Sequence, residues 1–396
     1  METPEIAQPL VLTRAALDRL VAALIEDGYL VVGPTVRDGA IVLDELDSGG
    51  ALPAGWGVDT GPGYYRLRPR HDAAVFAHSA GPGSWKEFLH PPRRQLWSAD
   101  AGGGFQPAAS PAPRYAFLGV RGCDLASIGI LGRVLGEGTY PDGAFARTRQ
   151  ALFVVAVNCT EPGGVCFCAS MGTGPGAGPG YDLALTERID DAGHWFLAEA
   201  GTAEGARILA GVPHRSASAA EQDTARAEVS AAAQRMGRNM PAVDLPLLIR
   251  DSVESPHWED VASRCLSCAN CTMVCPTCFC TTTEDVSDLT GSHAERWQRW
   301  ASCFEVDFSY VHGGSVRPSG ASRYRQWFSH KLGTWHEQFG SSGCVGCGRC
   351  IAWCPVGIDI TAEAARLADL AGLAGPAGAD GLADPAGGAG TGDQDE

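Results

Sequence analysis

The spacing of apolar residues in the first half of the chain predicts helices and strands in alternation. After Thr13, apolar side chains recur at helical spacing for three turns, so we expect an amphipathic helix capped by that threonine. Short apolar runs at 29–32 and 40–43 predict strands. Gly, Pro and Asp dominate 47–63, which we expect to be a loop, and we expect 99–113 to be a second flexible connection.

Two longer apolar runs predict neighbouring strands of a parallel sheet. The first run covers 115–120 and the second covers 151–157. Between them, we expect Asp124 to cap a helix over 125–135. A strand–helix–strand order of this kind is typical of a parallel βαβ unit, with the helix as the crossover.

The second half of the chain has mainly helical patterns. Ala-rich and amphipathic segments predict helices at 219–236 and 245–264. Two further segments, 288–300 and 324–339, are rich in Trp, His and Arg, and we expect them to be helical too.

One cysteine pattern occurs twice in this helical half. Each copy reads C-x2-C-x2-C-x3-C-P, a run that wraps a cubane iron–sulfur cluster and gives its fourth thiolate to a second cluster. Crossed ligation of this kind predicts two 4Fe–4S clusters. The ligands of the first would be Cys265, Cys268, Cys271 and Cys354. The ligands of the second would be Cys344, Cys347, Cys350 and Cys275.

Zinc sites and disulfides are the alternatives for such a cysteine-rich sequence. Zinc sites usually separate two C-x2-C halves by a dozen or more residues and rarely show this triple repeat followed by proline. Disulfide frameworks suit small secreted chains, whereas this one has 396 residues and no visible signal peptide. We therefore expect its fifteen cysteines to serve mainly as metal ligands.

These patterns predict a fold class of α+β or α/β. We expect an N-terminal α/β domain over 1–244, followed by a mainly helical domain over 245–372 that contains a dicluster ferredoxin-like module. The Gly/Ala-rich end, 373–396, has no apolar periodicity and is predicted to be a disordered acidic tail.

Four further cysteines in the N-terminal domain predict a third 4Fe–4S cluster. Two of them follow the two parallel strands, so their thiols would meet at the edge of the sheet where α/β folds place ligands. The other two lie in a Gly-rich loop, and the start of a helix would favour the thiolate form nearby. The alternative is four small buried core residues. These cysteines are Cys123, Cys159, Cys166 and Cys168.

Three cysteines and one Gly-rich loop remain. Cys278, Cys280 and Cys303 lack an obvious fourth partner, so packing is favoured over another metal site. The loop 172–180 resembles a phosphate loop only superficially, because its prolines remove N–H groups and no strand–helix context surrounds it. We expect it to be a flexible clamp beside the cysteines.

Charge and hydropathy narrow the functional classes. The net charge of −16 argues against nucleic-acid partners and anionic membranes. No apolar run is long enough to span a bilayer, and no export signal is visible, so the cytoplasm is the expected location. Lysine is rare while Gly, Ala and Pro are abundant, a bias typical of GC-rich genomes.

Several segments resemble the β subunit of cytosolic sulfhydrogenase-type, NAD(P)-linked nickel–iron hydrogenases. The A subunit of anaerobic sulfite reductase is similar. The resemblance covers most of residues 10–372. The segments that carry it are 121–125, 162–175, 180–187, 275–280 and 344–355.

The resemblance implies an electron-transfer subunit that is not catalytic by itself. Its partners would be a flavin- and NAD(P)-binding subunit and the small and large nickel–iron subunits. The sequence shows neither paired C-x2-C nickel motifs nor a dinucleotide fingerprint, which agrees with this role. The same relay in an anaerobic sulfite reductase is the first alternative. A stand-alone iron–sulfur enzyme or redox sensor is the alternative from another class.

Overall fold

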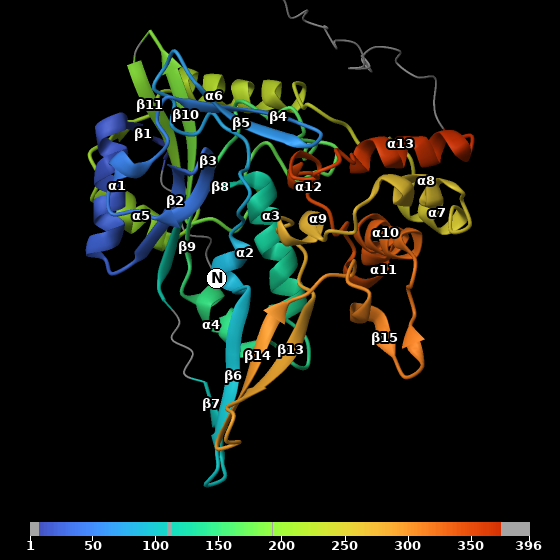
Figure 1. Cartoon of the computed structure of the whole chain (residues 1–396). Helices are drawn as coiled ribbons and strands as arrows, with labels where there is room; N and C mark the ends of the chain where they lie inside the picture. The colour runs from blue at the N-terminus through green and yellow to red at the C-terminus, as the bar shows by residue number, and fades with distance from the viewer. Residues whose placement is uncertain (1–7, 109–112, 192, 374–396) are drawn as a thin grey trace, which may run out of the picture.

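The computed structural model describes residues 8–108, 113–191 and 193–373. Its largest element is an eight-stranded mixed sheet (Figure 1). Its strands are β1 (Leu10–Thr13), β2 (Leu30–Arg37), β3 (Ala40–Glu45), β8 (Tyr115–Arg121), β9 (Phe153–Val157), β10 (Leu183–Asp190), β11 (Gly193–Ala200) and β12 (Arg215–Ser216). The order is β12-β1-β11-β10-β9-β8-β2-β3. The four strands β10, β9, β8 and β2 run parallel, and the other neighbours are antiparallel.

Helices cover both faces of this sheet, which explains the continuous apolar runs at its centre. All of β9 is buried: Phe153 and Val155 pack in the core formed with α1 (Arg14–Glu26), and Val154 packs on the side of α3 (Gly122–Leu131). Thr13 caps α1 by accepting a hydrogen bond from the backbone of Ala16, as predicted. The predicted parallel β8–β9 pair is also confirmed.

The remaining helices of this half are short, apart from α6. They are α2 (Lys86–Leu89), a π-helical turn (Gly132–Gly136), α4 (Gly143–Gln150), α5 (Ala203–Ala210) and α6 (Ala219–Ala233), with a 3-10 turn at Gly49–Ala51. The position predicted for Asp124 was wrong. Because α3 already begins at Gly122, with Arg121 as its N-cap, Asp124 lies in the first turn rather than capping a later helix.

A narrow four-stranded antiparallel sheet projects from the body like an arm (Figure 1). Its strands are β6 (Arg93–Asp100), β7 (Phe105–Pro107), β13 (Thr281–Ser287) and β14 (His293–Trp300), in the order β13-β14-β6-β7. The helix predicted at 288–300 is therefore wrong. The arm also joins strands from both sides of the predicted domain boundary at 244.

Cross-strand contacts explain why Trp and Arg residues here favour strands over a helix. The guanidinium of Arg93 lies 4.2 Å from the ring centre of Trp297, and that of Arg296 lies 5.1 Å from Trp97. Two predicted loops also contain strands. The segment 99–113 includes β7, and 47–63 includes β4 (Trp56–Gly61), which pairs with β5 (Tyr64–Pro69).

The C-terminal half is mainly helical, as predicted. Its elements are α7 (Leu245–Asp251), α8 (His257–Arg264), α9 (Asn270–Met273), α10 (Gly320–Ser329), a π-helical turn (His330–Thr334), α11 (Trp335–Phe339), α12 (Arg349–Ala352) and α13 (Ile360–Leu370), with a 3-10 turn (Asp307–Ser309) and the small hairpin β15 (Tyr310–Val311) and β16 (Gly314–Ser315). The single helix predicted over 245–264 is divided into α7 and α8 before Pro256. These helices share a core with partly buried cysteines.

The mixed fold class is confirmed by these two halves, a large α/β sheet and a helical cysteine-rich region. In Figure 1, α3 stands between the large sheet and the short helices α9 and α12. Almost all of the predicted acidic tail lies outside the described residues. Within the described ranges, no helix combines the length and apolar character needed to cross a membrane.

Candidate iron–sulfur centres

The two cysteine runs fold in the same way. In each run, two residues between the first and third cysteines have left-handed backbone, and a short helix follows, α9 in one and α12 in the other. This turn directs a backbone N–H at the first thiol: Ser267 N lies 3.4 Å from Cys265 Sγ, and Gly346 N lies 3.5 Å from Cys344 Sγ. The left-handed residues are Ser267, Ala269, Gly346 and Gly348.

The four thiols predicted for the first cluster meet around one apolar cavity. Aromatic side chains line part of it, and Cys350 from the second set also lines it. The lining includes Cys265, Cys268, Cys271 and Cys354, together with Phe304, Tyr324 and Trp327. Cys268 is exposed, so this group reaches the surface. Four sulfur donors around one partly enclosed space fit the ligand set of a cubane cluster.

The four thiols predicted for the second cluster also come together. Burial raises the pKa of Cys344 to about 12 and the pKa of Cys347 to about 11, and it raises the pKa of Cys350 as well. Cys275 interacts electrostatically with all three, although a hydrogen bond with Cys278 lowers its own pKa. Buried thiols that resist ionisation become thiolates when a metal replaces the proton, so this donor set fits a bound cluster.

The third group assembles at the C-terminal edge of the large sheet. Cys123 follows β8 and Cys159 follows β9, while Cys166 and Cys168 come from the loop beyond β9. Cys123 and Cys168 are hydrogen-bonded, and Cys166 has both Cys123 and Cys159 as electrostatic neighbours. The structure therefore brings together all four cysteines predicted for a third site, with sulfur donors suited to iron.

The expected helix effect on these thiols is not seen. The hydrogen bond with Cys168 and burial raise the pKa of Cys123 well above its usual value, although Cys123 lies in the first turn of α3. Burial likewise raises the pKa of Cys166 to about 12. Burial among neighbouring thiols therefore favours the protonated form of these cysteines.

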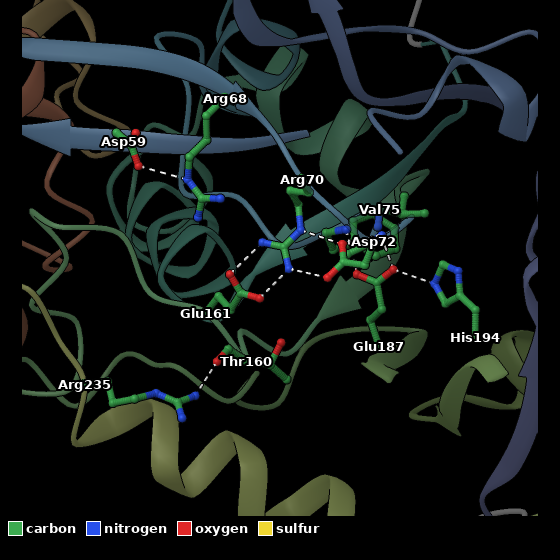
Figure 2. Close-up of polar contacts among 12 residues, drawn as sticks. Asp59, Arg68, Arg70, Asp72, Val75, Thr160, Glu161, Glu187, His194 and Arg235 are labelled. Atoms are coloured by element: carbon green, nitrogen blue, oxygen red, sulfur yellow. Dashed lines mark hydrogen bonds and ion pairs between the residues drawn. The ribbon is translucent and has the colours of Figure 1, made fainter. Parts of the chain in front are cut away.

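Ion pairs fix the loop that carries three of these cysteines (Figure 2). The guanidinium of Arg70 donates to both carboxylate oxygens of Glu161 at 2.7 Å and also binds Asp72 at 2.7 Å. On the other side, Arg235 donates to the carbonyl of Thr160 at 2.7 Å. Both contacts hold the segment directly after Cys159.

A second chain of contacts begins at Glu187, which Figure 2 shows beside Val75, and ends at Cys159. Glu187 accepts hydrogen bonds from the backbone of Val75 and Phe76 at 2.6 and 2.7 Å. The carbonyl of Phe76 in turn accepts from Arg121, whose other amino group lies 3.5 Å from Cys159 Sγ. Arg121 is buried, so it provides a fixed positive charge beside the third group.

The third group lies against the second run. The backbone N–H of Phe167 donates to the carbonyl of Gly346 at 2.9 Å, and Thr173 Oγ1 donates to the carbonyl of Val345 at 2.7 Å. Cys347 is an electrostatic neighbour of Cys166. The three groups therefore follow one another, with the second in the middle. A buried ion pair between Arg349 and Asp124, 2.9 Å long, joins the two halves here.

The Gly-rich loop 172–180 lies beside the cysteines, as expected. The backbone N–H of Cys159 donates to the carbonyl of Pro175 at 3.1 Å. A Cβ atom on Gly174 would lie 2.8 Å from Cys168 Sγ, so a side chain there would displace the thiol. The absence of a side chain at Gly174 therefore allows the loop to cover the third group closely.

Buried cations around the cysteines were not predicted from the sequence. Besides Arg121 and Arg349, they include Lys331, whose ammonium is disfavoured by burial but whose pKa is raised by the thiols of Cys275, Cys278 and Cys344. An isolated basic residue in a sequence carries no signal of burial, so only the fold could identify these three.

The three leftover cysteines lie near this lysine. Cys278 is hydrogen-bonded with Cys275, and burial raises the pKa of Cys303, which neighbours Cys280, to about 11. Among the described residues, no three His, Cys, Asp or Glu side chains converge closely enough to hold a single metal ion. A cubane makes no such demand, because its four thiolates bind four different irons.

Comparison with known proteins agrees with this geometry. A family model described as a 4Fe-4S dicluster domain matches residues 264–358, the segment that contains both cysteine runs. Sulfhydrogenase 2 subunit beta of Pyrococcus furiosus is 30% identical over 251 residues, which cover 62% of this chain and 72% of that protein. No solved structure matches. The chain belongs to the family of sulfhydrogenase β-type subunits, iron–sulfur proteins with a 4Fe–4S dicluster domain.

Proposed function

We propose that this chain is the electron-transfer subunit of a multisubunit, NAD(P)-linked nickel–iron hydrogenase and that it holds three 4Fe–4S clusters. When bound, such clusters supply one-electron transfer. The observation that carries the proposal is the succession of three four-cysteine groups, in which Cys347 of the second neighbours Cys166 of the third. Cys350 of the second group lines the cavity of the first.

The chain's own residues would fix the geometry and shield the sites. Backbone N–H groups directed at Cys265 and Cys344 stabilise negative charge on sulfur. Tyr324 and Trp327 would shield part of the first group from water. By itself the subunit would not be catalytic. Its partners would be a flavin- and NAD(P)-binding subunit and the nickel–iron subunits, in the cytoplasm, without nucleic acid or membrane.

Iron and sulfide analysis of the anaerobically prepared full chain tests the cluster number. Three cubanes require about twelve irons and twelve sulfides per chain. Replacing Cys166 with serine should remove about four of each while leaving the ferredoxin-type pair spectroscopically intact. A fully reconstituted wild-type value near eight would remove the third cluster from the proposal and return these cysteines to the core.

Purification of the complex from its native host tests the partners. We expect a nickel-containing large subunit and a flavoprotein to co-purify with the chain. Within that complex, Cys347→Ser should abolish electron flow between hydrogen and NAD(P), whereas hydrogen uptake with a dye at the catalytic subunit should partly survive. Recovery of a sirohaem subunit instead would assign the chain to a sulfite reductase.

A further inference from the structure

Only two of the 30 basic residues in the chain are lysine, Lys86 and Lys331. Both are buried, with 2% and 6% of their surface exposed. They come from different halves of the molecule, Lys86 from α2 and Lys331 from the π-helical turn at His330–Thr334. A GC-rich genome explains why lysine is rare, but it does not explain why both lysines are buried near the same thiols.

Lys331 is hydrogen-bonded both to Cys275 of the second cysteine group and to Thr277 beside it. Its Nζ donates to Thr277 Oγ1 at 3.1 Å, and the same oxygen lies 3.2 Å from Cys275 Sγ. Thr277 Oγ1 also lies 2.7 Å from the carbonyl of Gly343, the residue before Cys344. Since the hydroxyl proton is donated to this carbonyl, the oxygen is left to accept from the ammonium.

Lys86 approaches the same region from the α/β half. Its Nζ lies 3.7 Å from the ring centre of Trp300 and 3.5 Å from the carbonyl of Met273. Burial lowers the pKa of Lys86, and among its titratable neighbours Cys278 and then Cys275 oppose this most strongly. Among the described residues, neither lysine forms an ion pair with a carboxylate, whereas buried Arg349 pairs with Asp124.

A buried cation without an anionic partner is costly, so these ammonium groups require nearby negative charge. The thiolates of the second cysteine group would supply that charge when they hold a cluster. An ammonium is a compact point charge that can direct its protons at one oxygen, whereas the planar guanidinium needs a wider acceptor surface. Lysine therefore suits the single hydroxyl acceptor of Thr277.

We propose that Lys331, assisted by Lys86, raises the reduction potential of the cluster bound by Cys275, Cys344, Cys347 and Cys350. The proposal rests on the proposed function, because it requires a cluster at this group. Reduction adds one negative charge there, and a fixed positive charge nearby in a poorly solvated region stabilises the reduced state.

Redox titration of the reconstituted full chain, followed by electron paramagnetic resonance, tests the proposal. Lys331→Met removes the charge but keeps an apolar chain of similar length. We expect it to decrease the reduction equilibrium constant of one cluster at least tenfold, which lowers the potential of that cluster by about 59 mV or more. The potentials of the other clusters should stay unchanged. The affected signal should be the one missing in Cys347→Ser.

Three further variants separate charge from packing. Lys331→Arg keeps the charge and should give a potential closer to wild type than Lys331→Met does. Lys86→Met should shift the same signal in the same direction but by less. Arg94→Met is the matched control, because Arg94 is 19% exposed and pairs with Asp142 at 2.7 Å rather than with thiols, so all potentials should stay unchanged.

The outcomes distinguish this inference from the proposed function. If the wild-type chain fails to assemble a cluster at the second group, the proposed function is wrong. If iron and sulfide contents of Lys331→Met equal those of wild type and its potentials are also unchanged, only the role of Lys331 is refuted. An equal shift in the Arg94→Met control would likewise overturn it, since the effect would then not depend on the thiols.

Discussion

The buried ion pair between Arg349 and Asp124 should hold the ferredoxin-type region against the α/β half. Arg349 is 3% and Asp124 4% exposed at the side chain, and their Nη1 and Oδ1 atoms lie 2.9 Å apart. The Nε group of Arg349 also donates to the carbonyls of Gly81 and Gly83 at 3.2 and 3.1 Å. Removing the guanidinium therefore deprives one carboxylate and two carbonyls of this hydrogen-bond donor.

We expect Arg349→Met to cost about 3–5 kcal/mol of apparent unfolding free energy, because a buried charge loses its partner. Urea unfolding of the anaerobic full chain measures this cost. Asp124→Leu combined with Arg349→Met should recover most of it, since neither charge then remains buried. The exposed pair of Arg207 and Glu204 offers a matched control, and Arg207→Met should barely move the midpoint. An unchanged midpoint in Arg349→Met, or no recovery in the double variant, would refute this reasoning.

Two further predictions concern a glycine and a histidine. Gly346→Ala should destabilise the chain and release iron from the third group, because the added Cβ would lie 2.6 Å from the Cys168 backbone. Gly340 has the same φ of +67° but open space around it, so Gly340→Ala is the control. In thermal melting, we expect that control to cost only about 1 kcal/mol. Burial lowers the pKa of His78 to about 3. Between pH 6.5 and 5 the unfolded chain therefore binds a proton at this residue that the folded chain does not. As the pH falls through this range, His78 should reduce the free energy of unfolding by up to about 1.4 kcal/mol per pH unit. His78→Gln should reduce that slope in urea titrations across this range, and an identical slope would contradict the assignment.

Local patterns in the sequence predicted the central sheet well but failed for the arm. The strands β8 and β9 are continuous apolar runs, so their own residues determine their burial. In contrast, β14 lies between β13, which precedes it in the sequence, and β6, which is far away in the sequence and pairs with it from His293 to Arg299. Within the sequence alone, its Trp and Arg residues are equally compatible with a helical surface.

The cysteine groups were predictable to the extent that spacing or topology encodes them. The ferredoxin-type runs carry their geometry in the sequence, and the third group followed from two thiols placed after parallel strands. Asp124 shows the limit: its partner Arg349 lies 225 residues away, so its role could not be read from the start of a helix. Lys331 and Arg121 were missed for the same reason.

Exposure and nearby positive charge differ among the three cysteine groups. Cys268 of the first group is exposed, whereas the second group lies between the others and faces buried Lys331. Arg121 supplies a buried charge to the third group, but the described walls of the first cavity contain no basic side chain. Uneven positive charge of this kind should separate the potentials of clusters that share the same ligands, because each potential depends on its surroundings as well as on its thiolates. A cluster bound by the first group should exchange electrons most easily with an outside partner, because Cys268 is exposed.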